Sequence, residues 1–155
     1  MNQRFTWIAA LWLLLPGILF SADKPKFGPV PGWVKPIVAD LNATFSPDEV
    51  GTGYIGLLID TQHNQQTHEL FSHTVYQVEN AVGVQEYSEI GASWNPQFET
   101  VVFHYIKVIR DGVEMDRMIP DNFTIMQLEP NLQMHLYDGR LSALTALADI
   151  RPGDI

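Results

Sequence analysis

The sequence predicts an all-β fold, an antiparallel β-sandwich. Short runs rich in valine, isoleucine and aromatic residues recur from about residue 53 onward, and turn residues separate them. Two of the separations contain an Asp-Gly pair, which is typical of tight hairpin turns. A hydrophobic fraction of 46% with only 17% charged residues excludes a disordered chain. The sequence therefore predicts one β domain over residues 53–155.

Residues 1–22 have the order of a signal peptide. Arg4 supplies a positive charge, an apolar run extends from Phe5 to Phe20, and small Ser21 and Ala22 follow. The run is a little short of the roughly 18 to 20 apolar residues that a spanning helix needs. Cleaved export is therefore favoured, and bulky Phe20 at a position that is usually small keeps an uncleaved anchor as the alternative.

Residues 23–52 form a proline-rich segment before the β domain. Each proline removes a hydrogen-bond donor and restricts the preceding residue, so regular structure is broken into short pieces. Within the segment we expect Trp33 to Ile37 to be extended, with Trp33 packed on the core. Ser46 to Glu49 could cap one helical turn.

The β domain begins with two apolar runs that we interpret as strands. Asn80 to Gly83 is then expected to close a loop, and further strands follow. The last run is ambiguous between strand and helix because its periodicity fits both. In order, the predicted strands are Tyr54–Asp60, His68–Glu79, Val84–Ile90, Thr100–Arg110, Phe123–Leu128 and the ambiguous Leu141–Leu147.

Asp111-Gly112 is the strongest local signal, because a type I′ turn needs positive φ at both central residues. Pairing outward from a two-residue turn places Val108 opposite Met115. It also places Lys107 opposite Asp116, a charge pair worth about 0.2 to 1 kcal/mol across two strands. A three-residue loop with a bulge would shift this register by one. Asp138-Gly139 offers a second turn of the same kind.

The segment from Arg151 to Ile155 has the pattern of a turn that leads into a new strand. Pro152 presets φ for such a turn and Gly153 tolerates positive φ. An unpaired apolar strand start is a poor place for a domain to stop, because an open edge invites pairing with other chains. We therefore expect the sandwich to be incomplete at its C-terminus and the sequence to be the front part of a longer secreted protein.

Charge and composition exclude several classes of function. The formal net charge of −9 and the lack of any basic run argue against nucleic acid or an anionic membrane as partner. The cysteine count of zero removes disulfides, thiolate metal sites and a cysteine nucleophile from these residues. The sequence contains no phosphate loop, dinucleotide fingerprint or G-x-S-x-G motif. We expect no cofactor.

The histidines do not form a recognisable reactive site. His68 and His73 are five residues apart, whereas a zinc-binding helix places its histidines at i and i+4. His104 lies within an apolar strand, where a partly buried histidine satisfied by a hydrogen bond is more common than catalysis. An enzyme would need His73, His104 or His135 to converge with a carboxylate in a pocket, which is the least favoured alternative.

Several aromatic residues exceed the needs of a minimal core. They fill the sandwich, or they form a docking face for a neighbouring domain, where aromatic residues are enriched. The residues in question are Trp33, Trp94, Phe98, Tyr105 and Tyr137.

The strand and turn segments together resemble the bacterial family of domain of unknown function 3857, which precedes a transglutaminase-like domain in exported proteins. The resemblance implies an immunoglobulin-like β-sandwich, followed by a domain with a Cys-His-Asp arrangement that this chain does not contain. It assigns no catalytic residue to this module. The segments that carry it are Trp33–Pro36, Phe71–Val78, Asn80, Gly83–Val84, Pro96, His104, Ile106, Arg110–Gly112, Asp116–Arg117, Leu136–Gly139, Asp149 and Gly153–Ile155.

We therefore predict a non-catalytic accessory domain of an exported, periplasmic protein that supports or positions a downstream transglutaminase-like domain of the same polypeptide. The alternative is a free-standing module that binds a peptide or glycan through Trp94, Tyr105 or Tyr137. The predicted docking or family-motif positions are His104, Arg110, Asp111, Gly112, Tyr137, Asp138 and Gly139.

Overall fold

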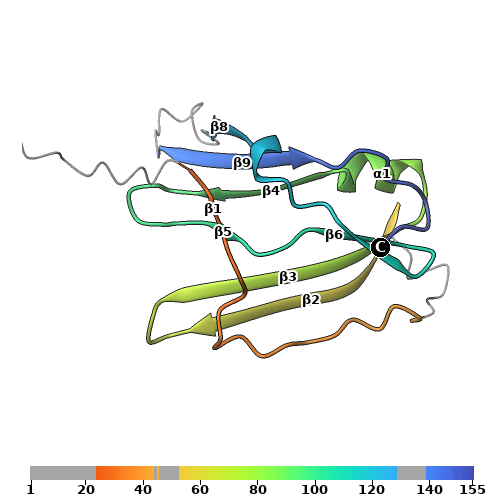
Figure 1. Cartoon of the computed structure of the whole chain (residues 1–155), viewed down its shortest axis with the longest axis horizontal. Coiled ribbons are helices and arrows are strands. Elements are labelled where there is room, and N and C mark those ends of the chain that lie inside the picture. The colour runs from red at the N-terminus through yellow and green to blue at the C-terminus, as the bar shows by residue number, and fades with distance from the viewer. Residues whose placement is uncertain (1–23, 44, 46–52, 129–138) are drawn as a thin grey trace, which may run out of the picture.

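The computed structural model describes residues 24–43, 45, 53–128 and 139–155. Within these ranges the protein is mostly β, with one α-helix and a 3₁₀ turn at Pro120–Asn122 (Figure 1). The elements in order are β1 (Lys26–Phe27), β2 (Tyr54–Asn64), β3 (Glu69–Val78), α1 (Ala81–Tyr87), β4 (Glu89–Trp94), β5 (Val102–Phe103), β6 (Lys107–Arg110), β7 (Val113–Asp116), β8 (Thr124–Leu128) and β9 (Arg140–Ala146).

The strands form small sheets that are antiparallel except for the pair of β1 and β5. β2 pairs with β3, β6 pairs with β7, and β9 lies between β4 and β8. In Figure 1 the β2–β3 hairpin runs along one side of the molecule and the β4-β9-β8 sheet along the other, with β5 and β6 between them. The prediction of an antiparallel all-β protein is confirmed at this level.

The β2–β3 hairpin confirms the two predicted strands at the start of the β domain. Its ladder runs from Tyr54 opposite Val78 to Asn64 opposite Glu69, with a β-bulge between Gly56 and Leu58. Apolar and β-branched residues at alternate positions favour this long ladder. It brings buried Asp60 directly opposite His73.

The predicted loop over Asn80–Gly83 and strand over Val84–Ile90 are wrong, because Ala81–Tyr87 forms helix α1. Asn80 caps this helix: its Oδ1 accepts hydrogen bonds from the backbone N–H groups of Val82 (2.8 Å) and Gly83 (3.3 Å). The cap satisfies two donors that the first turn leaves free. The strand that follows is Glu89–Trp94, so only its first residues overlap the predicted one.

Close approach of two glycines fixes α1 against the start of β2. A Cβ atom on Gly83 would lie 1.8 Å from the carbonyl oxygen of Gly53, a distance that real atoms do not reach. The backbone N–H of Glu79 also donates to Gly53 O at 2.9 Å. The helix therefore needs a residue without a side chain at position 83.

The predicted single strand Thr100–Arg110 is divided in two. Its first part, β5, pairs in parallel with β1, whereas its second part, β6, pairs with β7. The two parts bond to different partners, so the backbone leaves strand geometry between them. Rings of Phe27, Phe103 and Phe123 pack at centroid distances of 4.6 to 6.0 Å and hold β1 and β5 beside the start of β8.

The β6–β7 hairpin confirms the predicted two-residue turn and its register. Asp111 and Gly112 have φ values of 52° and 76°, and Val108 lies opposite Met115. Lys107 lies opposite Asp116 as predicted, but its ammonium forms the ion pair with Glu114, at 2.6 Å. Lys107 pairs with its diagonal neighbour Glu114 because a long lysine side chain reaches across the ladder.

The ambiguous run near the C-terminus is a strand, β9, at the centre of its sheet. Ser142, Ala143 and Thr145 are buried there between β4 and β8. Trp94 at the end of β4 is 2% exposed, and Ser93 Oγ donates to Ser142 Oγ at 3.2 Å. The buried apolar residues of the described chain are Phe71, Val78, Trp94, Ile106, Val108 and Ala143.

Residues Gly153–Ile155 join β3 to β6. The N–H of Gly153 donates to Val78 O (2.7 Å), and the N–H of Val78 donates to Asp154 O (2.8 Å). Ile155 exchanges both backbone bonds with Ile109, at 3.0 and 2.7 Å. The predicted turn is present, because Gly153 has a φ of 92° and Asp154 N donates to Arg151 O.

The part of the proline-rich segment around Trp33 and Lys35 lies against the β2–β3 hairpin rather than in the core. Half-buried Trp33 donates from Nε1 to Glu69 Oε2 at 2.6 Å. The side-chain amide of Gln62 bonds both backbone groups of Lys35, at 2.7 and 2.9 Å. Thus Trp33 to Ile37 forms no strand, and its tryptophan packs at the tip of the hairpin.

Some sequence predictions fall outside the described residues. They are the signal peptide, the helical turn at Ser46–Glu49, His135, and Tyr137 and Asp138, which precede Gly139. None of the helices in the described ranges has the length and apolar character to cross a membrane.

Candidate functional site: the C-terminal polar cluster

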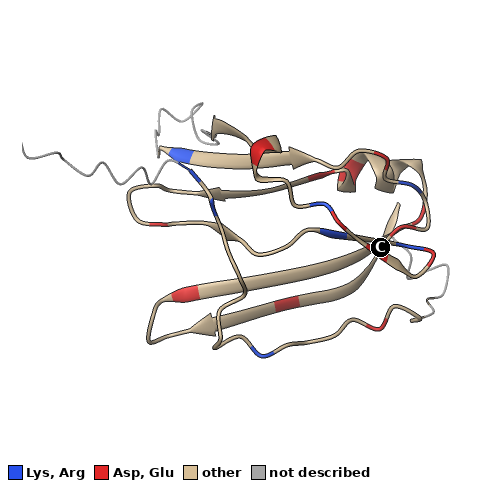
Figure 2. Cartoon of the chain, in the orientation of Figure 1, with Lys and Arg blue, Asp and Glu red and all other residues tan. Residues whose placement is uncertain are grey.

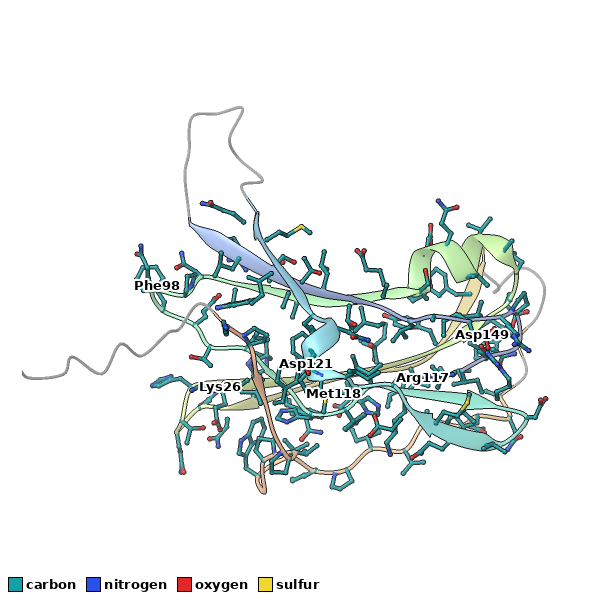
Figure 3. All side chains as sticks on the ribbon, turned by 45° about the horizontal axis from the view of Figure 1, so that its top comes forward. Lys26, Phe98, Arg117, Met118, Asp121 and Asp149 are labelled. Atoms are coloured by element: carbon teal, nitrogen blue, oxygen red, sulfur yellow. The ribbon has the colours of Figure 1, made fainter. Side chains whose placement is uncertain are left out.

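A cluster of charged side chains surrounds the turn that carries Ile155 to β6. Arg110, the last residue of β6, supplies the central cation, and the loop after β9 supplies the others. We call Arg110, Asp149, Arg151 and Asp154 the C-terminal polar cluster. Figure 2 shows acidic and basic residues gathered at this end of the molecule, and Figure 3 shows Asp149 at the opposite end from exposed Phe98.

The pair of Arg110 and Asp154 is the best-shielded part of the cluster. Nε and Nη2 of Arg110 donate to the two carboxylate oxygens of Asp154, both at 2.7 Å. Such a two-bond arrangement uses the planar fork of arginine and is stronger than a single ionic contact. The side chain of Asp154 is 3% exposed, and it also accepts the N–H of Arg151 at 2.8 Å.

Asp149 occupies the solvent side of the cluster. It lies between two arginines: Arg110 Nη1 donates to its Oδ2 at 3.0 Å, and Arg151 donates to both of its oxygens at 2.7 to 2.9 Å. Arg110 Nη2 also donates to the backbone carbonyl of Asp149. Asp149 has a φ of 65°, a conformation that aspartate tolerates better than most residues. The bonds hold this loop in place.

Hydrogen bonding stabilises the charged forms of Arg110, Asp149 and Asp154. The guanidinium of Arg110 lowers the pKa of Asp154, against the opposing effect of burial. The guanidinium of Arg151, followed by that of Arg110, lowers the pKa of Asp149. These two carboxylates in turn raise the pKa of Arg110. The acids therefore remain ionised at neutral pH and have no tendency to act as proton donors there.

The chemistry of this cluster is that of a structural clamp. The oxygens of Asp154 bond Arg110 and a backbone N–H, so they are already occupied. The bonds connect β6, the loop after β9 and the turn at Gly153. Two segments far apart in the sequence, the end of β6 and the chain after β9, are thus held at one place.

His104 is confirmed as a half-buried histidine satisfied by a hydrogen bond. Its Nδ1 lies 3.0 Å from Gly28 O, and a carbonyl only accepts, so Nδ1 carries the proton. Its ring packs 5.9 Å from that of Phe71. His104 connects the β5–β6 segment to the chain after β1 and lies outside the C-terminal polar cluster.

The other predicted positions that the structure describes lie at turns. Asp111 and Gly112 form the exposed β6–β7 turn next to Arg110. Gly139 precedes β9 with a φ of 65°, while Tyr137 and Asp138 are outside the described residues. Of the predicted positions that the structure describes, only Arg110 belongs to the C-terminal polar cluster.

A second polar group, which was not predicted from the sequence, lies between β2–β3 and the β5–β6 segment. Asp60 is 7% exposed, accepts Gln62 Nε2 at 2.8 Å, and lies opposite His73. The His73 ring packs edge-on against Tyr105 at 5.4 Å. Burial lowers the pKa of His73, and the Asp60 charge opposes this shift. The sequence feature that could have indicated this group is the single aspartate, Asp60, at the end of an otherwise apolar run.

The hairpin tip holds a small open pocket of about 250 Å³. Its lining includes His63, His68 and Glu69, a set of residue types that metal sites use. Within the described chain, however, no three His, Asp or Glu side chains are grouped to hold a metal ion. Glu69 instead accepts bonds from Trp33 and Thr67.

The candidate aromatic residues divide into different environments. Trp94 is buried in the core, whereas Phe98 is 82% exposed and Tyr105 is 37% exposed. Burial raises the pKa of the Tyr105 hydroxyl, although Lys107 lies 5.5 Å above its ring. The described aromatic residues therefore do not form one platform.

The fold and the cluster define a β-rich domain whose charged residues hold distant segments together. The model of the family described as "Domain of Unknown Function with solved-structure structure (DUF3857)" matches residues 64–155, so the chain belongs to this family. No curated protein and no solved structure matches the chain.

Proposed function

We propose that this protein is a non-catalytic accessory domain that supports or positions a downstream transglutaminase-like domain of the same polypeptide. The observation that carries the proposal is the pairing of Arg110 with Asp154. Both residues belong to the segments that carry the family resemblance, and their side chains hold a backbone turn in place. A residue set devoted to positioning a chain segment suits a support role better than a reaction.

We also propose an immunoglobulin-like sandwich fold and a periplasmic location for this protein. An immunoglobulin-like sandwich would form if β2–β3 and β6–β7 joined into one sheet opposite β4-β9-β8, and Gly153–Ile155 supports this by bonding to both hairpins. Export to the periplasm rests on the charge, apolar run and small residues of the first 22 positions. The net charge of −9 supports a partner that is neither nucleic acid nor an anionic membrane.

The test is alanine substitution in a full-length protein that carries the downstream domain. Arg110→Ala should lower the melting temperature or loosen docking of the two domains, and leave turnover by the folded full-length protein unchanged. Arg151→Ala is the matched control, because the Arg151 side chain is 59% exposed and, among the described residues, donates to the exposed carboxylate of Asp149 and leaves the pair of Arg110 and Asp154 in place. Loss of turnover in Arg110→Ala with unchanged melting and docking would refute the support role.

A peptide- or glycan-binding module is the second candidate, and the hairpin-tip pocket favours it. The pocket combines polar groups of Asn64, Gln65 and Glu69 with apolar Leu70, which is 62% exposed. Chemical-shift mapping with oligosaccharides and short peptides would test it. Saturable shifts confined to these residues and lost in Leu70→Ser would favour the second candidate over the first.

A further inference from the structure

Arg117 lies on the inner face of the β6–β7 hairpin, just after β7 ends (Figure 3). Its backbone N–H donates to Ile106 O at 2.8 Å, which adds one pair to the ladder in which Val108 lies opposite Met115. Opposed residues of a ladder share a face, and every second pair lies on the same face. Ile106 and Val108 are both buried, so Arg117 is on the face of the hairpin that meets the core.

The guanidinium of Arg117 is a half-buried cation that the described residues do not neutralise. Its Nε is buried and has no hydrogen-bond partner there. Its Nη2 contacts Met115 Sδ at 3.6 Å, and a thioether sulfur is a weak acceptor. Arg110 by contrast forms ion pairs with two carboxylates, whereas no carboxylate of the described chain forms one with Arg117. Burial of a cation without an anion is unfavourable, because burial removes part of its hydration.

The carboxylates nearest to Arg117 along the hairpin have other partners. Asp116 is adjacent in the chain, so its side chain points to the opposite face of the hairpin. Its Oδ1 accepts the backbone N–H of Met118 at 2.9 Å. Glu114 bonds Lys107 at 2.6 Å. The guanidinium of Arg117 is therefore available to an anion from another molecule.

The surroundings of the guanidinium favour one kind of anion. A planar guanidinium matches a carboxylate through two parallel hydrogen bonds. The formal net charge of −9 repels a phosphate dianion more strongly than a singly charged acid. The side chains that share the face of Arg117 are those of Ile106, Val108 and Met115, so an apolar group next to the acid would find apolar neighbours.

We propose that Arg117 is the anion-binding residue of a site for a monocarboxylate whose acid group is attached to an apolar chain. The end of the guanidinium would hold the acid, and Met115 would contact the apolar chain. The site shares no residue with the C-terminal polar cluster. It does not rest on the proposed function, because it requires no downstream domain.

The experiment follows the Nε–Hε signal of Arg117 in NMR spectra of the ¹⁵N-labelled full chain while hexanoate is added at neutral pH and constant ionic strength. The signal should shift saturably, with a dissociation constant on the order of 1 mM, as expected for one charge pair and a short apolar contact. Hexanamide has the same apolar chain without the charge, and inorganic phosphate has the charge without the chain. Neither control should cause a saturable shift.

A parallel titration with N-acetyl-leucine, which has the chemistry of a peptide C-terminus, distinguishes two sources of the acid. Tighter binding of N-acetyl-leucine than of hexanoate assigns the site to a peptide C-terminus. Tighter binding of hexanoate assigns it to a free aliphatic acid.

Arg140 provides a matched comparison, because it is also half-buried but already has acceptors. Its Nη2 donates to Ser93 O at 3.2 Å and lies 4.0 Å from Glu99 Oε2, so its own Nε–Hε signal should not move. Arg117→Lys keeps the charge and loses the planar fork, so it should weaken hexanoate binding on the order of tenfold. Arg140→Lys should leave that binding unchanged.

An Arg117 signal that stays unshifted up to about 20 mM hexanoate, well above the expected constant, would overturn the site. Equal shifts with hexanoate and hexanamide would overturn it too, because the charge would then play no part. Binding that Arg117→Lys leaves unchanged would have the same meaning. The titration of the unchanged protein decides the question by itself if the lysine variant does not fold.

Discussion

Arg110 and Asp154 form a two-bond ion pair, with both N–O distances at 2.7 Å and the carboxylate 3% exposed. Forty-odd residues of sequence separate the partners, and the pair joins the end of β6 to the turn before Ile155. A carboxylate so shielded is stable only while its partner is present. The pair therefore makes the position of the turn depend on one side chain.

Acid should weaken the fold through Asp154. Its pKa is lowered in the folded protein, so its contribution to stability is complete above the unfolded value of about 4 and is lost as the pH falls through the folded value. Asp154→Asn should reduce the free energy of unfolding by about 2 kcal/mol at pH 7 and flatten the decline below pH 4. Urea titrations at several pH values measure this. Asp121→Asn, in the exposed 3₁₀ turn, is the control.

A second acid-sensitive phase should come from His73. Burial lowers its folded pKa below the ordinary value of about 6.5, so neutral His73 favours the folded state above that pH. This stabilisation is lost as the pH falls through the folded value, with a slope of at most about 1.4 kcal/mol per pH unit for one group. His73→Gln should remove the dependence between pH 7 and 5. A variant that keeps the full slope, or a flat His63→Gln control, would contradict the assignment.

Gly83→Ala should destabilise the protein, although alanine is the better helix former by about 1 kcal/mol. The added Cβ would meet Gly53 O at 1.8 Å and Gly53 C at 2.7 Å, so the backbone must shift. We expect a loss of about 3 kcal/mol, the upper part of the usual range for overpacking. Thermal melts of Gly83→Ala and Gly32→Ala provide the comparison, since nothing lies within 4 Å of a Cβ on Gly32. A stabilised Gly83→Ala protein would refute the close approach.

Asn80→Ala should cost about 1 kcal/mol of stability, because the first turn of α1 loses the acceptor for Val82 and Gly83. Asn80→Asp keeps that acceptor and adds a negative charge near the helix N-terminus, so it should be neutral or slightly stabilising. Chemical denaturation of the three proteins gives the ranking. Equal stability of the alanine and aspartate variants would show that the cap bonds contribute nothing.

Local chemistry explains which elements could be predicted. The Asp111-Gly112 turn fixes the register of β6 and β7 because both residues accept positive φ, so no distant information is needed. Helix α1 was missed because valine and tyrosine favour strands, and the close approach of Gly83 to Gly53 is a long-range contact that the local pattern does not show. The break between β5 and β6 was missed for a similar reason. It depends on β1, which lies more than seventy residues earlier in the sequence.

The polar cluster could be predicted only in part. Arg110 and Asp154 both belong to the segments that carry the family resemblance, but nothing in the sequence pairs them. Lys107 shows the same limit at short range: its register was predicted, whereas its ion-pair partner is the diagonal Glu114. Side-chain partners depend on reach and on three-dimensional neighbours, which periodicity does not encode.

The bonds of Gly153–Ile155 to Val78 and Ile109 also set the order in which the molecule can assemble. During synthesis, β3 and β6 emerge long before the residues that tie them together. Each hairpin can close by itself at that stage, while the long-range ladder must wait. The nascent chain thus passes through a period with two uncovered strand edges, when a chaperone would give the greatest protection against aggregation.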